Sequence, residues 1–376
     1  MMKSKLGIYF FFSNVIDSAI YRSLLIEFAT DEYDLHCIFI GNETLPLFKF
    51  SQTMPIKSRH ITRTNKTQII QLMISSTFEL AISRPKVVFC FGQTASVVGL
   101  TASALSCKAK RHHLRMHTSM NRVEHFPRGI LYDKISNFLA QVIVVPNKNT
   151  QSYLIDIESV KANKLVEISF GFHLNEFGSC DSHRTQVFQE FYDIPADRYV
   201  IGIASRFTHI KGLQYSLPAV ANFLANSPLA MVVIAGFGEE APQELHELLA
   251  DISKSQLRLI PRVADMPAFY GNLSAFIHTP IDETVESFGL VYIEAFAAGV
   301  PSIITLSGIA KEVAIDGVNS MVIKYKDSAG IQKALETLAS NKNLSEAISL
   351  NAKKSVSTFG MEKMCAQYVS LIKKSF

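Results

Sequence analysis

The sequence contains no tryptophan, little charge and few cysteines, and each shortage argues against a class of protein. The five cysteines among 376 residues are scattered and form no C-x-x-C pair. This argues against a disulfide framework or a cysteine-rich zinc site and fits a reducing compartment. Charged residues make up 19% of the chain and hydrophobic residues 48%. Disordered, collagen-like and coiled-coil proteins are therefore excluded, and the chain is long enough for two domains, each with its own core.

No apolar run reaches the roughly 18 residues that a membrane span needs. The start resembles a signal peptide, because Lys3 and Lys5 precede the apolar run 6–12. Asn14 and Asp17 follow at once, however, and no small-x-small cleavage site appears. We interpret the run as a buried first strand, with a signal as the alternative. We therefore expect a cytoplasmic protein, or one that is peripheral on the cytoplasmic face of a membrane.

The charge is unevenly divided between the two halves. Residues 1–170 hold 20 Lys/Arg and 12 Asp/Glu, whereas residues 171–376 hold 17 and 21. The resulting +8 and −4 predict two domains with different partners. The densest basic stretch, 108–128, is either a solvated loop or helix face, or a surface for a phosphate-bearing substrate, an anionic membrane or a nucleic acid. It contains Lys108, Lys110, Arg111, Arg115, Arg122 and Arg128, one acid, Glu124, and four histidines, His112, His113, His117 and His125.

Short apolar runs alternate with amphipathic stretches of helical length. This alternation predicts an α/β fold, with parallel sheets covered by helices on both faces. We predict strands at residues 7–12, 36–40, 87–91, 142–145, 166–169, 200–204, 230–235, 256–259, 275–279 and 302–305.

The polar segment before residue 200 divides the chain into two doubly wound, Rossmann-like domains. We expect the first over residues 1–170, a linker over 171–198 and the second over 199–355. A helix within 356–376 covers one of the two, and a return to the N-terminal domain is left open. Because ligands of open α/β sheets bind at the carboxyl ends of the strands, the site is expected in a cleft between the domains.

Two cations follow the predicted strand 200–204. Arg206 and Lys211 are expected in the loop at its carboxyl end. The planar guanidinium of arginine and the compact ammonium group of lysine are both suited to binding a diphosphate. Gly212 permits a close approach before the next helix. The alternative is an ordinary loop with two solvated cations.

The segment ESFGLVYIEAFAAGVP, residues 286–301, is the most informative. Residues 290–298 are predicted to be helical, because Gly299 suits the position after the helix and Pro301 ends it. The helix would present the backbone N–H groups of Phe288, Gly289 and Leu290 to an anion or a hydroxyl oxygen.

Two carboxylates belong to the same segment. Glu286 precedes the predicted helix and Glu294 lies in its second turn. If neither glutamate is functional, Glu286 would complement the dipole of the helix and Glu294 would be exposed to solvent. The apolar neighbours of Glu294 argue for a bound partner, because an unpaired carboxylate is costly in apolar surroundings.

These residues resemble the retaining GT-B glycosyltransferases of family 4, also described as glycosyl transferases group 1. The two glutamates match the E-x7-E signature. The stretches ASRFTHIKG, IAGFGEE, LIPRV and GIAKEVAIDGVNSMVI follow the family's order over about residues 200–325. The ending FGMEKMCAQYVSLIKKSF is similar to the family's terminal helix.

The resemblance implies a GT-B fold whose second domain holds a nucleotide-sugar donor. By position, Arg206 and Lys211 would bind the diphosphate, and Glu294 the ribose hydroxyls. Glu286, with the backbone of Phe288, Gly289 and Leu290, would hold the transferred sugar.

The resemblance also implies a nucleobase pocket lined by Arg262 and Val263. Pro261 stands where relatives have glycine, which leaves a UDP-sugar and a GDP-sugar both open. In the N-terminal half the family's Gly-Gly loop is absent, and Ser13 and Asn14 stand in its place.

The resemblance further implies a functional histidine, for which His117 is the best-placed candidate and His112 and His113 are rivals. The alternative is that His117 has a structural role and is held by a hydrogen bond. Arg111 and Arg115 join Ser13 and Asn14 as acceptor-side candidates.

The expected chemistry is the stabilisation of a diphosphate leaving group. Glu286, His117, Arg206 and Lys211 are the catalytic candidates. No Asp-x-Asp occurs, so no metal or other cofactor is expected, and the nucleotide sugar is a substrate. The resemblance implies retention of configuration, by a front-face route without a protein nucleophile or by a double displacement that needs a carboxylate beneath the anomeric carbon.

We therefore expect a glycosyltransferase that acts on a glycan or lipid-linked glycan acceptor. Cell-surface polysaccharide or lipopolysaccharide synthesis, near an anionic membrane, would use such an enzyme. The alternatives are an inactive nucleotide-sugar-binding scaffold subunit and a GT-B sugar-nucleotide epimerase. The acidic second half and the lack of a recognition motif argue against nucleic acid as a partner.

Overall fold

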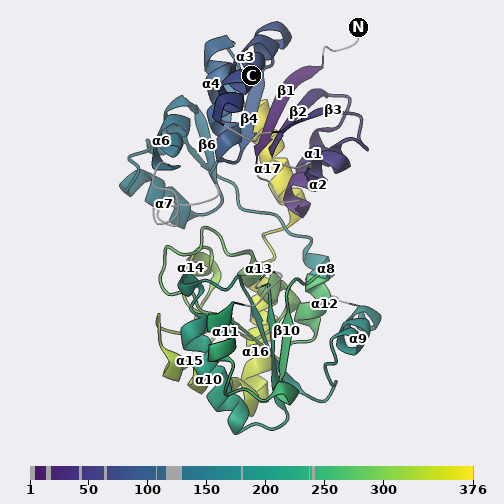
Figure 1. The fold of residues 1–376 in the computed structure, drawn as a ribbon, viewed down its shortest axis with the longest axis vertical. Coiled ribbons are helices and arrows are strands. Elements are labelled where there is room, and N and C mark those ends of the chain that lie inside the picture. The colour runs from purple at the N-terminus through teal and green to yellow at the C-terminus, as the bar shows by residue number, and fades with distance from the viewer. Residues whose placement is uncertain are drawn as a thin grey trace. The chain divides into compact units, whose positions relative to one another are not determined.

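The computed structural model describes residues 5–13, 18–41, 45–62, 66–106, 108–115, 129–178, 181–236, 238 and 242–375. The chain divides into two compact units (Figure 1). Unit 1 comprises Met1–Phe172 together with Met361–Phe376, and unit 2 comprises His173–Gly360. Each unit is built on its own parallel sheet with helices on both faces, so the predicted α/β class is confirmed.

The described part of unit 1 contains a seven-stranded sheet in the order β3-β2-β1-β4-β5-β6-β7. All neighbouring strands are parallel. The strands are β1 (Leu6–Ser13), β2 (Tyr33–Gly41), β3 (Lys57–Thr62), β4 (Val87–Phe91), β5 (Lys110–Leu114), β6 (Val142–Val145) and β7 (Leu165–Glu167). The helices are α1 (Ala19–Phe28), α2 (Pro46–Ser51), α3 (Lys66–Ser83), α4 (Gln93–Ser106), α6 (Gly129–Leu139), α7 (Lys148–Asp156), α17 (Met361–Lys373) and the 3₁₀ turn η1 (Ala162–Lys164).

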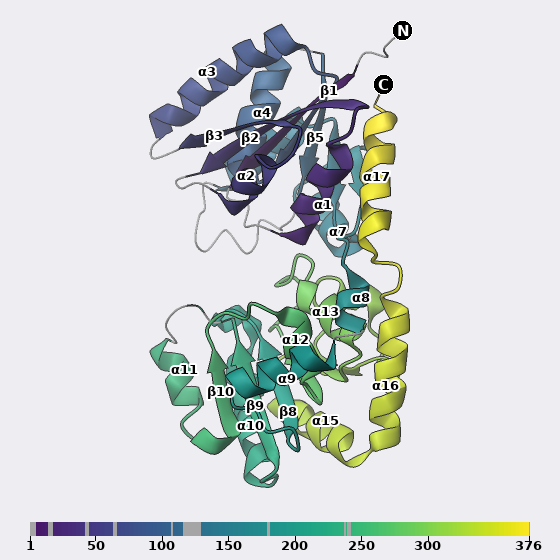
Figure 2. The same cartoon turned by 90° about the vertical axis from the view of Figure 1, so that its right-hand side faces the viewer.

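Strand β1 is apolar throughout its centre because both faces of the sheet are covered. Tyr9 and Phe11 pack into a core formed with α3 and α4. Phe10 points to the other face, where its ring lies 5.4 Å from that of Phe28 at the end of α1. Helix α17, from the far end of the chain, lies beside α1 on this face (Figure 2). The rings of Tyr368 and Phe89 are 5.6 Å apart, so α17 completes the core of unit 1.

The described part of unit 2 contains a six-stranded sheet in the order β10-β9-β8-β11-β12-β13, again entirely parallel. The strands are β8 (Tyr199–Ala204), β9 (Ala230–Ala235), β10 (Leu257–Ile260), β11 (Ala275–His278), β12 (Ser302–Ile304) and β13 (Met321–Val322). The helices are α8 (Leu174–Gly178), α9 (Ser182–Phe191), α10 (Leu213–Ala225), α11 (Gln243–Leu248), α12 (Met266–Gly271), α13 (Leu290–Ala298), α14 (Ala310–Val313), α15 (Ser328–Ser340) and α16 (Lys342–Ser355). Two 3₁₀ turns are η2 (His209–Lys211) and η3 (Lys254–Gln256).

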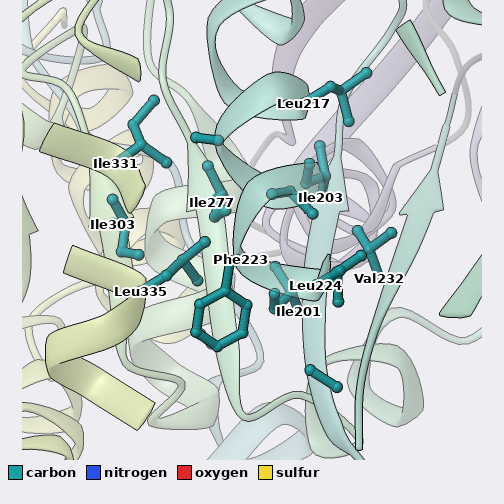
Figure 3. Close-up of a cluster of buried hydrophobic side chains, with 14 of the residues drawn as sticks. Ile201, Ile203, Leu217, Phe223, Leu224, Val232, Ile277, Ile303, Ile331 and Leu335 are labelled. Carbon is teal, nitrogen blue, oxygen red and sulfur yellow. The ribbon is translucent and has the colours of Figure 1, made fainter. Parts of the chain in front are cut away.

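The core of unit 2 lies on both faces of its sheet. On one face, Ile201 and Ile203 of β8 meet Leu217 of α10 and Leu335 of α15 (Figure 3). On the other, Val200 packs with residues of α12 and α13. The alternation of side chains along β8 therefore sends successive residues into two separate cores.

The structure differs from the sequence-based expectation at three strands and at the linker. Strands β3, β5 and β13 were not predicted. Strand β3 consists of exposed and half-buried residues at the sheet edge, β5 begins with Lys110 and Arg111, and β13 has two residues. The predicted linker, 171–198, contains helices α8 and α9, and α9 packs on α12 of unit 2.

None of the helices in the described ranges is both long enough and apolar enough to cross a membrane.

Candidate active site

The carboxyl edge of the unit 2 sheet brings three loops together. Strand β8 is the first in the unit and pairs with both β9 and β11, so the strand order reverses at β8 and β11. The N–H of Ile281, after β11, donates to the carbonyl of Ile210, after β8, at 3.1 Å. The N–H of Ile309, after β12, donates to the carbonyl of Phe288 at 2.8 Å. A reversal of this kind is where open α/β sheets bind ligands.

Two glycines permit this close packing. Gly212 has φ +78°, and a Cβ atom there would lie 2.0 Å from the carbonyl oxygen of Thr279. Gly308 has φ +58°, and its Cβ would lie 2.5 Å from the carbonyl oxygen of Phe288. Neither position accommodates a side chain, so the backbone on both sides of the site depends on glycine.

Glu286 lies at the centre of the site. Its Oε1 atom accepts hydrogen bonds from Lys211 Nζ at 2.5 Å and from His278 Nε2 at 2.7 Å. Its backbone N–H donates to Ser307 Oγ at 2.9 Å. Lys211 follows β8 in η2, His278 ends β11 and Ser307 follows β12, so groups from three neighbouring strands of the sheet position Glu286.

The charges of this cluster are fixed by burial and by its hydrogen bonds. Burial alone would raise the pKa of Glu286, but the hydrogen bonds and charges of His278 and Lys211 outweigh it and lower that pKa to about 2. Burial lowers the pKa of His278, although Glu286 opposes the shift. At neutral pH, Glu286 is thus ionised and a neutral His278 donates from Nε2.

One oxygen of the Glu286 carboxylate remains available to a ligand. Within the described residues both side-chain bonds end on Oε1, and Oε2 has no hydrogen-bond partner. The hydroxyl of Thr279 is also buried and has no partner among the described residues. An ionised oxygen and an unused hydroxyl at the end of β11 are suited to binding a polar ligand.

Helix α13 begins beside Glu286. Gly289, with φ +84°, is the residue before the helix, and no side chain of the described residues caps this end. Phe288 is buried, whereas Leu290 is 40% exposed. The helix ends at Gly299, as the sequence predicts. An amino end without a side-chain cap favours an anion or a hydroxyl oxygen nearby.

Glu294 lies within α13 and has a different environment from Glu286. Its Oε2 accepts a hydrogen bond from the hydroxyl of the buried Tyr270 at 3.1 Å. Burial raises the pKa of Glu294 to about 7, with the Tyr270 hydrogen bond opposing the shift. Unlike Glu286, it forms no ion pair with the described residues. A ligand that donates hydrogen bonds to the ionised carboxylate would compensate for its burial.

We expect this burial to make stability depend on pH. The folded protein binds the Glu294 proton with a pKa of about 7, against an ordinary value of 4.5. The stabilising effect is therefore complete below about pH 4.5 and is lost as the pH rises through about 7. Over this range the Tm of the unmodified protein should fall more than that of Glu294→Gln, as measured by scanning calorimetry. Parallel curves for the two proteins would contradict this prediction.

The remaining predicted donor residues follow strands β8 and β10. Arg206 is exposed just after β8 and forms no ion pair within the described ranges. Arg262 is exposed after β10, while Val263 is half-buried against the core. Both loops lie at the same carboxyl edge as Glu286.

The candidate site residues of unit 1 are spread over strands β1 and β5 and over segments outside the described residues. Ser13 ends β1, is buried, and accepts a hydrogen bond from the N–H of Ala95 in the first turn of α4 at 2.9 Å. Asn14 and His117 lie outside the described residues. His112 and His113 are buried within β5, where His113 Nδ1 and Ser96 Oγ lie 2.7 Å apart. Burial, with a smaller effect of the Lys110 charge, lowers the pKa of His112 to about 4.

The structure corrects the assignment of Arg115 to the acceptor side. Its side chain is completely buried, and Nη2 donates to Asp133 at 3.3 Å and to Glu158 at 2.5 Å. Asn137 accepts from Nη1 at 3.2 Å. Two acids balance the guanidinium, so Arg115 is a structural centre and is not available to an acceptor.

Arg111 lies toward the other edge of the unit 1 sheet, and its acceptor-side role stays a prediction. It is the second residue of β5 and therefore lies toward the amino edge of the sheet, opposite to the edge where α/β sheets bind ligands. Its Nε donates to the carbonyl of Leu139 at the end of α6 at 2.8 Å. The cation therefore stabilises the carboxyl end of a helix.

Sequence reasoning missed three side chains of the site: His278, Ser307 and Tyr270. His278 had a signal, because it ends a predicted strand just before Glu286. Nothing local marked Ser307 or Tyr270, whose partners lie 21 and 24 residues away. Among the described residues no group of three or more His, Cys, Asp or Glu is arranged to hold a metal ion. Metal independence stays a prediction.

Comparison with known proteins gives similarity over both units. Residues 185–355 match the family model described as glycosyl transferases group 1. The chain is 24% identical over 301 residues to the capsular polysaccharide biosynthesis glycosyltransferase CapM of Staphylococcus aureus, covering 78% of each protein. It is 26% identical over 182 residues to the lipopolysaccharide core biosynthesis glycosyltransferase LpsE of Rhizobium meliloti, covering 48% of this chain and 51% of LpsE.

A solved structure matches nearly the whole chain. HepE of Anabaena, crystallised in complex with UDP, superimposes with a TM-score of 0.81 at 18% identity. The match covers 98% of this chain and 100% of HepE. At this level of identity the likeness concerns the fold, and the GT-B fold is thereby confirmed.

Proposed function

Because residues 185–355 match the family model described as glycosyl transferases group 1, we propose that the chain belongs to this family and is a retaining glycosyltransferase that uses a nucleotide-sugar donor. The family gives the reaction class, glycosyl transfer. The observation that supports the donor most directly is the Lys211–Glu286–His278 cluster at the strand-order reversal of unit 2.

In this proposal the donor lies along the carboxyl edge of the unit 2 sheet. The exposed Arg206 and the half-buried Lys211 neutralise the diphosphate. Glu286 accepts hydrogen bonds from the transferred sugar through Oε2, and Glu294 accepts them from the ribose. HepE was crystallised with UDP, which favours a UDP-sugar over a GDP-sugar here. Arg262 and Val263 would line the base pocket.

The chemistry is mainly stabilisation of the leaving group. As the bond from the sugar to the diphosphate breaks, negative charge grows on the phosphate oxygens. Preorganised cations and the amino end of α13 stabilise that charge more strongly than water does. Glu286 is already engaged by Lys211 and His278, so we assign it to binding the sugar hydroxyls rather than to nucleophilic attack. We therefore propose a front-face reaction with retention and without a metal.

The acceptor is proposed to be a glycan or a lipid-linked glycan bound by unit 1. CapM and LpsE are described as enzymes of capsular polysaccharide and lipopolysaccharide core synthesis. These relatives support a role in cell-surface polysaccharide or lipopolysaccharide synthesis. The cytoplasmic face of a membrane as the place of the reaction is part of the proposal and does not rest on the names of these relatives.

Thermal unfolding with UDP-, GDP- and ADP-sugars, without added metal, tests the donor. A ligand at 100 times its Kd should stabilise the protein by about 2.7 kcal/mol. We expect a UDP-sugar to raise the Tm, and Arg206→Ala to reduce the shift. Lys342→Ala, an exposed cation at the start of α16, is the control and should leave it unchanged. No shift from any sugar nucleotide would contradict the proposal.

The same preparation separates the two alternatives. Binding without transfer to any lipid or glycan extract would indicate a scaffold subunit. Conversion of the donor in the absence of an acceptor would indicate an epimerase. The anomeric configuration of a transfer product, read by NMR, tests retention.

A further inference from the structure

Four loops of unit 1 lie side by side at the amino edge of its sheet. Helices α3, α4, α6 and α7 each lead into the next strand, β4, β5, β6 and β7 respectively. These strands are parallel neighbours in that order. Their entry points therefore form one row about 15 Å long, at roughly 4.8 Å per strand. We call this row the amino edge, comprising residues 82–86, 105–111, 138–141 and 157–164.

Each helix ends at the amino edge with an exposed large apolar side chain. Ile82 of α3 is 84% exposed, Leu105 of α4 is 73% and Phe138 of α6 is 82%. These are the three highest values for large apolar side chains in the described part of unit 1. Ile157, just after α7, is 64% exposed. Four such side chains in one row form an apolar surface rather than scattered exceptions.

The apolar surface continues along α3. Ile70, Ile74 and Phe78 are exposed at four-residue intervals that lead to Ile82. The other exposed side chains of this helix, within its described part, are uncharged threonine, glutamine and serine. A helix that faces water normally has charged residues on its outer side.

Cations surround these apolar side chains. Lys164 Nζ donates to the carbonyl of Phe138 at 3.1 Å, and Arg111 Nε donates to that of Leu139 at 2.8 Å, so two cations bind the carboxyl end of α6, where Phe138 is exposed. Within these four loops the one acid is Glu158, which is buried against Arg115. Asp156 is exposed at the end of α7, and Asp31 and Glu32 are exposed before strand β2 of the same sheet. The exposed cations of the amino edge are Arg84, Lys86, Lys108, Lys110 and Lys161.

This combination favours an anionic lipid surface over another protein. Interface cores between proteins are depleted in lysine, whereas four of the five exposed cations here are lysines. A symmetric pairing with a second copy would place the cations of one chain against those of the other. At a lipid surface, by contrast, the apolar side chains enter the boundary of the acyl chains while lysines reach the phosphates.

We propose that the amino edge of unit 1, through Ile82, Leu105, Phe138 and the lysines between them, binds the surface of an anionic bilayer. The binding agrees with a lipid-linked acceptor but does not require the proposed reaction. Its test uses neither donor nor acceptor, so a failure here is distinct from a failure of donor binding.

Flotation of the whole chain with phosphatidylcholine vesicles, with and without equimolar phosphatidylglycerol, tests the proposal. We expect binding to the anionic vesicles that weakens as salt rises. The double variant Lys108→Gln/Lys110→Gln should bind about 30-fold more weakly, since each cation near an anionic surface contributes about 1 kcal/mol. Phe138→Gln should weaken binding by about tenfold or more, because an inserted ring loses contact with water.

Matched variants in unit 2 serve as controls. Phe191→Gln removes a ring that is 78% exposed on α9, and Lys254→Gln removes an exposed lysine of η3. Both should bind like the unmodified chain. Equal binding to the two vesicle types, or equal effects of the unit 1 and unit 2 variants, would overturn the proposal. Self-association without vesicles that the Phe138→Gln change abolishes, seen by sedimentation velocity, would assign the surface to a second copy instead.

Discussion

Replacing Lys211 with methionine should lower the rate of sugar transfer by about 10²–10³-fold, the usual cost of one group that stabilises charge in the transition state. Lys211 is held against Glu286 at the end of β8, and its side chain is only 12% exposed. Such a cation needs no reorganisation as the diphosphate leaves. Methionine keeps much of the length of the side chain and removes the charge.

The measurement is kcat and KM for transfer from the donor that the thermal screen identifies. Lys211→Met also leaves Glu286 with only His278 among the described residues, and loss of one partner of a buried ion pair often costs about 3–5 kcal/mol. Lys211→Arg retains the charge and keeps the test interpretable if the methionine variant unfolds. Lys311→Met, an exposed lysine that contacts Glu283, is the control. A folded Lys211→Met protein with normal kcat would refute the role.

Replacing Arg115 with methionine should destabilise the protein by about 3–5 kcal/mol, because Asp133 and Glu158 would lose their shared cation while still buried. Urea denaturation followed by circular dichroism measures the loss. Arg111→Met is the control on the same strand. It removes one hydrogen bond to a helix carbonyl and should cost about 1 kcal/mol.

Neutralising the acids separates structure from function. Asp133→Asn and Glu158→Gln, added to Arg115→Met, should recover part of the lost stability, because no uncompensated charge then remains buried. A stable Arg115→Met protein with a raised KM for the acceptor would instead restore the acceptor role that the sequence suggested.

The fold and unit 2 were largely predictable because their signals are local. The apolar run 200–204 and the helix that ends at Gly299 appear in the structure almost as predicted. Strand β5 was not predictable in the same way. Lys110 and Arg111 precede two histidines, so the stretch does not look like a strand in the sequence. Only its pairing with the neighbouring strands β4 and β6 shows that its backbone lies inside the sheet.

The site itself shows where sequence patterns stop being informative. Spacing located Glu286 and Glu294 but said nothing of their ionisation. One has its pKa lowered to about 2 and the other raised to about 7, because His278 and Lys211 surround the first while burial beside Tyr270 dominates the second. These partners come from other loops and strands, so the difference arises only on folding.

The return of helix α17 to unit 1 also has a consequence for biosynthesis. Unit 2 is one continuous segment and can fold as soon as it leaves the ribosome, whereas unit 1 lacks Tyr368 against Phe89 until residues 361–373 have been made. The aromatic face of the N-terminal sheet therefore lacks the cover of α17 while the 188 residues of unit 2 are translated. At about 5–20 residues per second that delay is on the order of 10–40 s, long enough for a chaperone to bind.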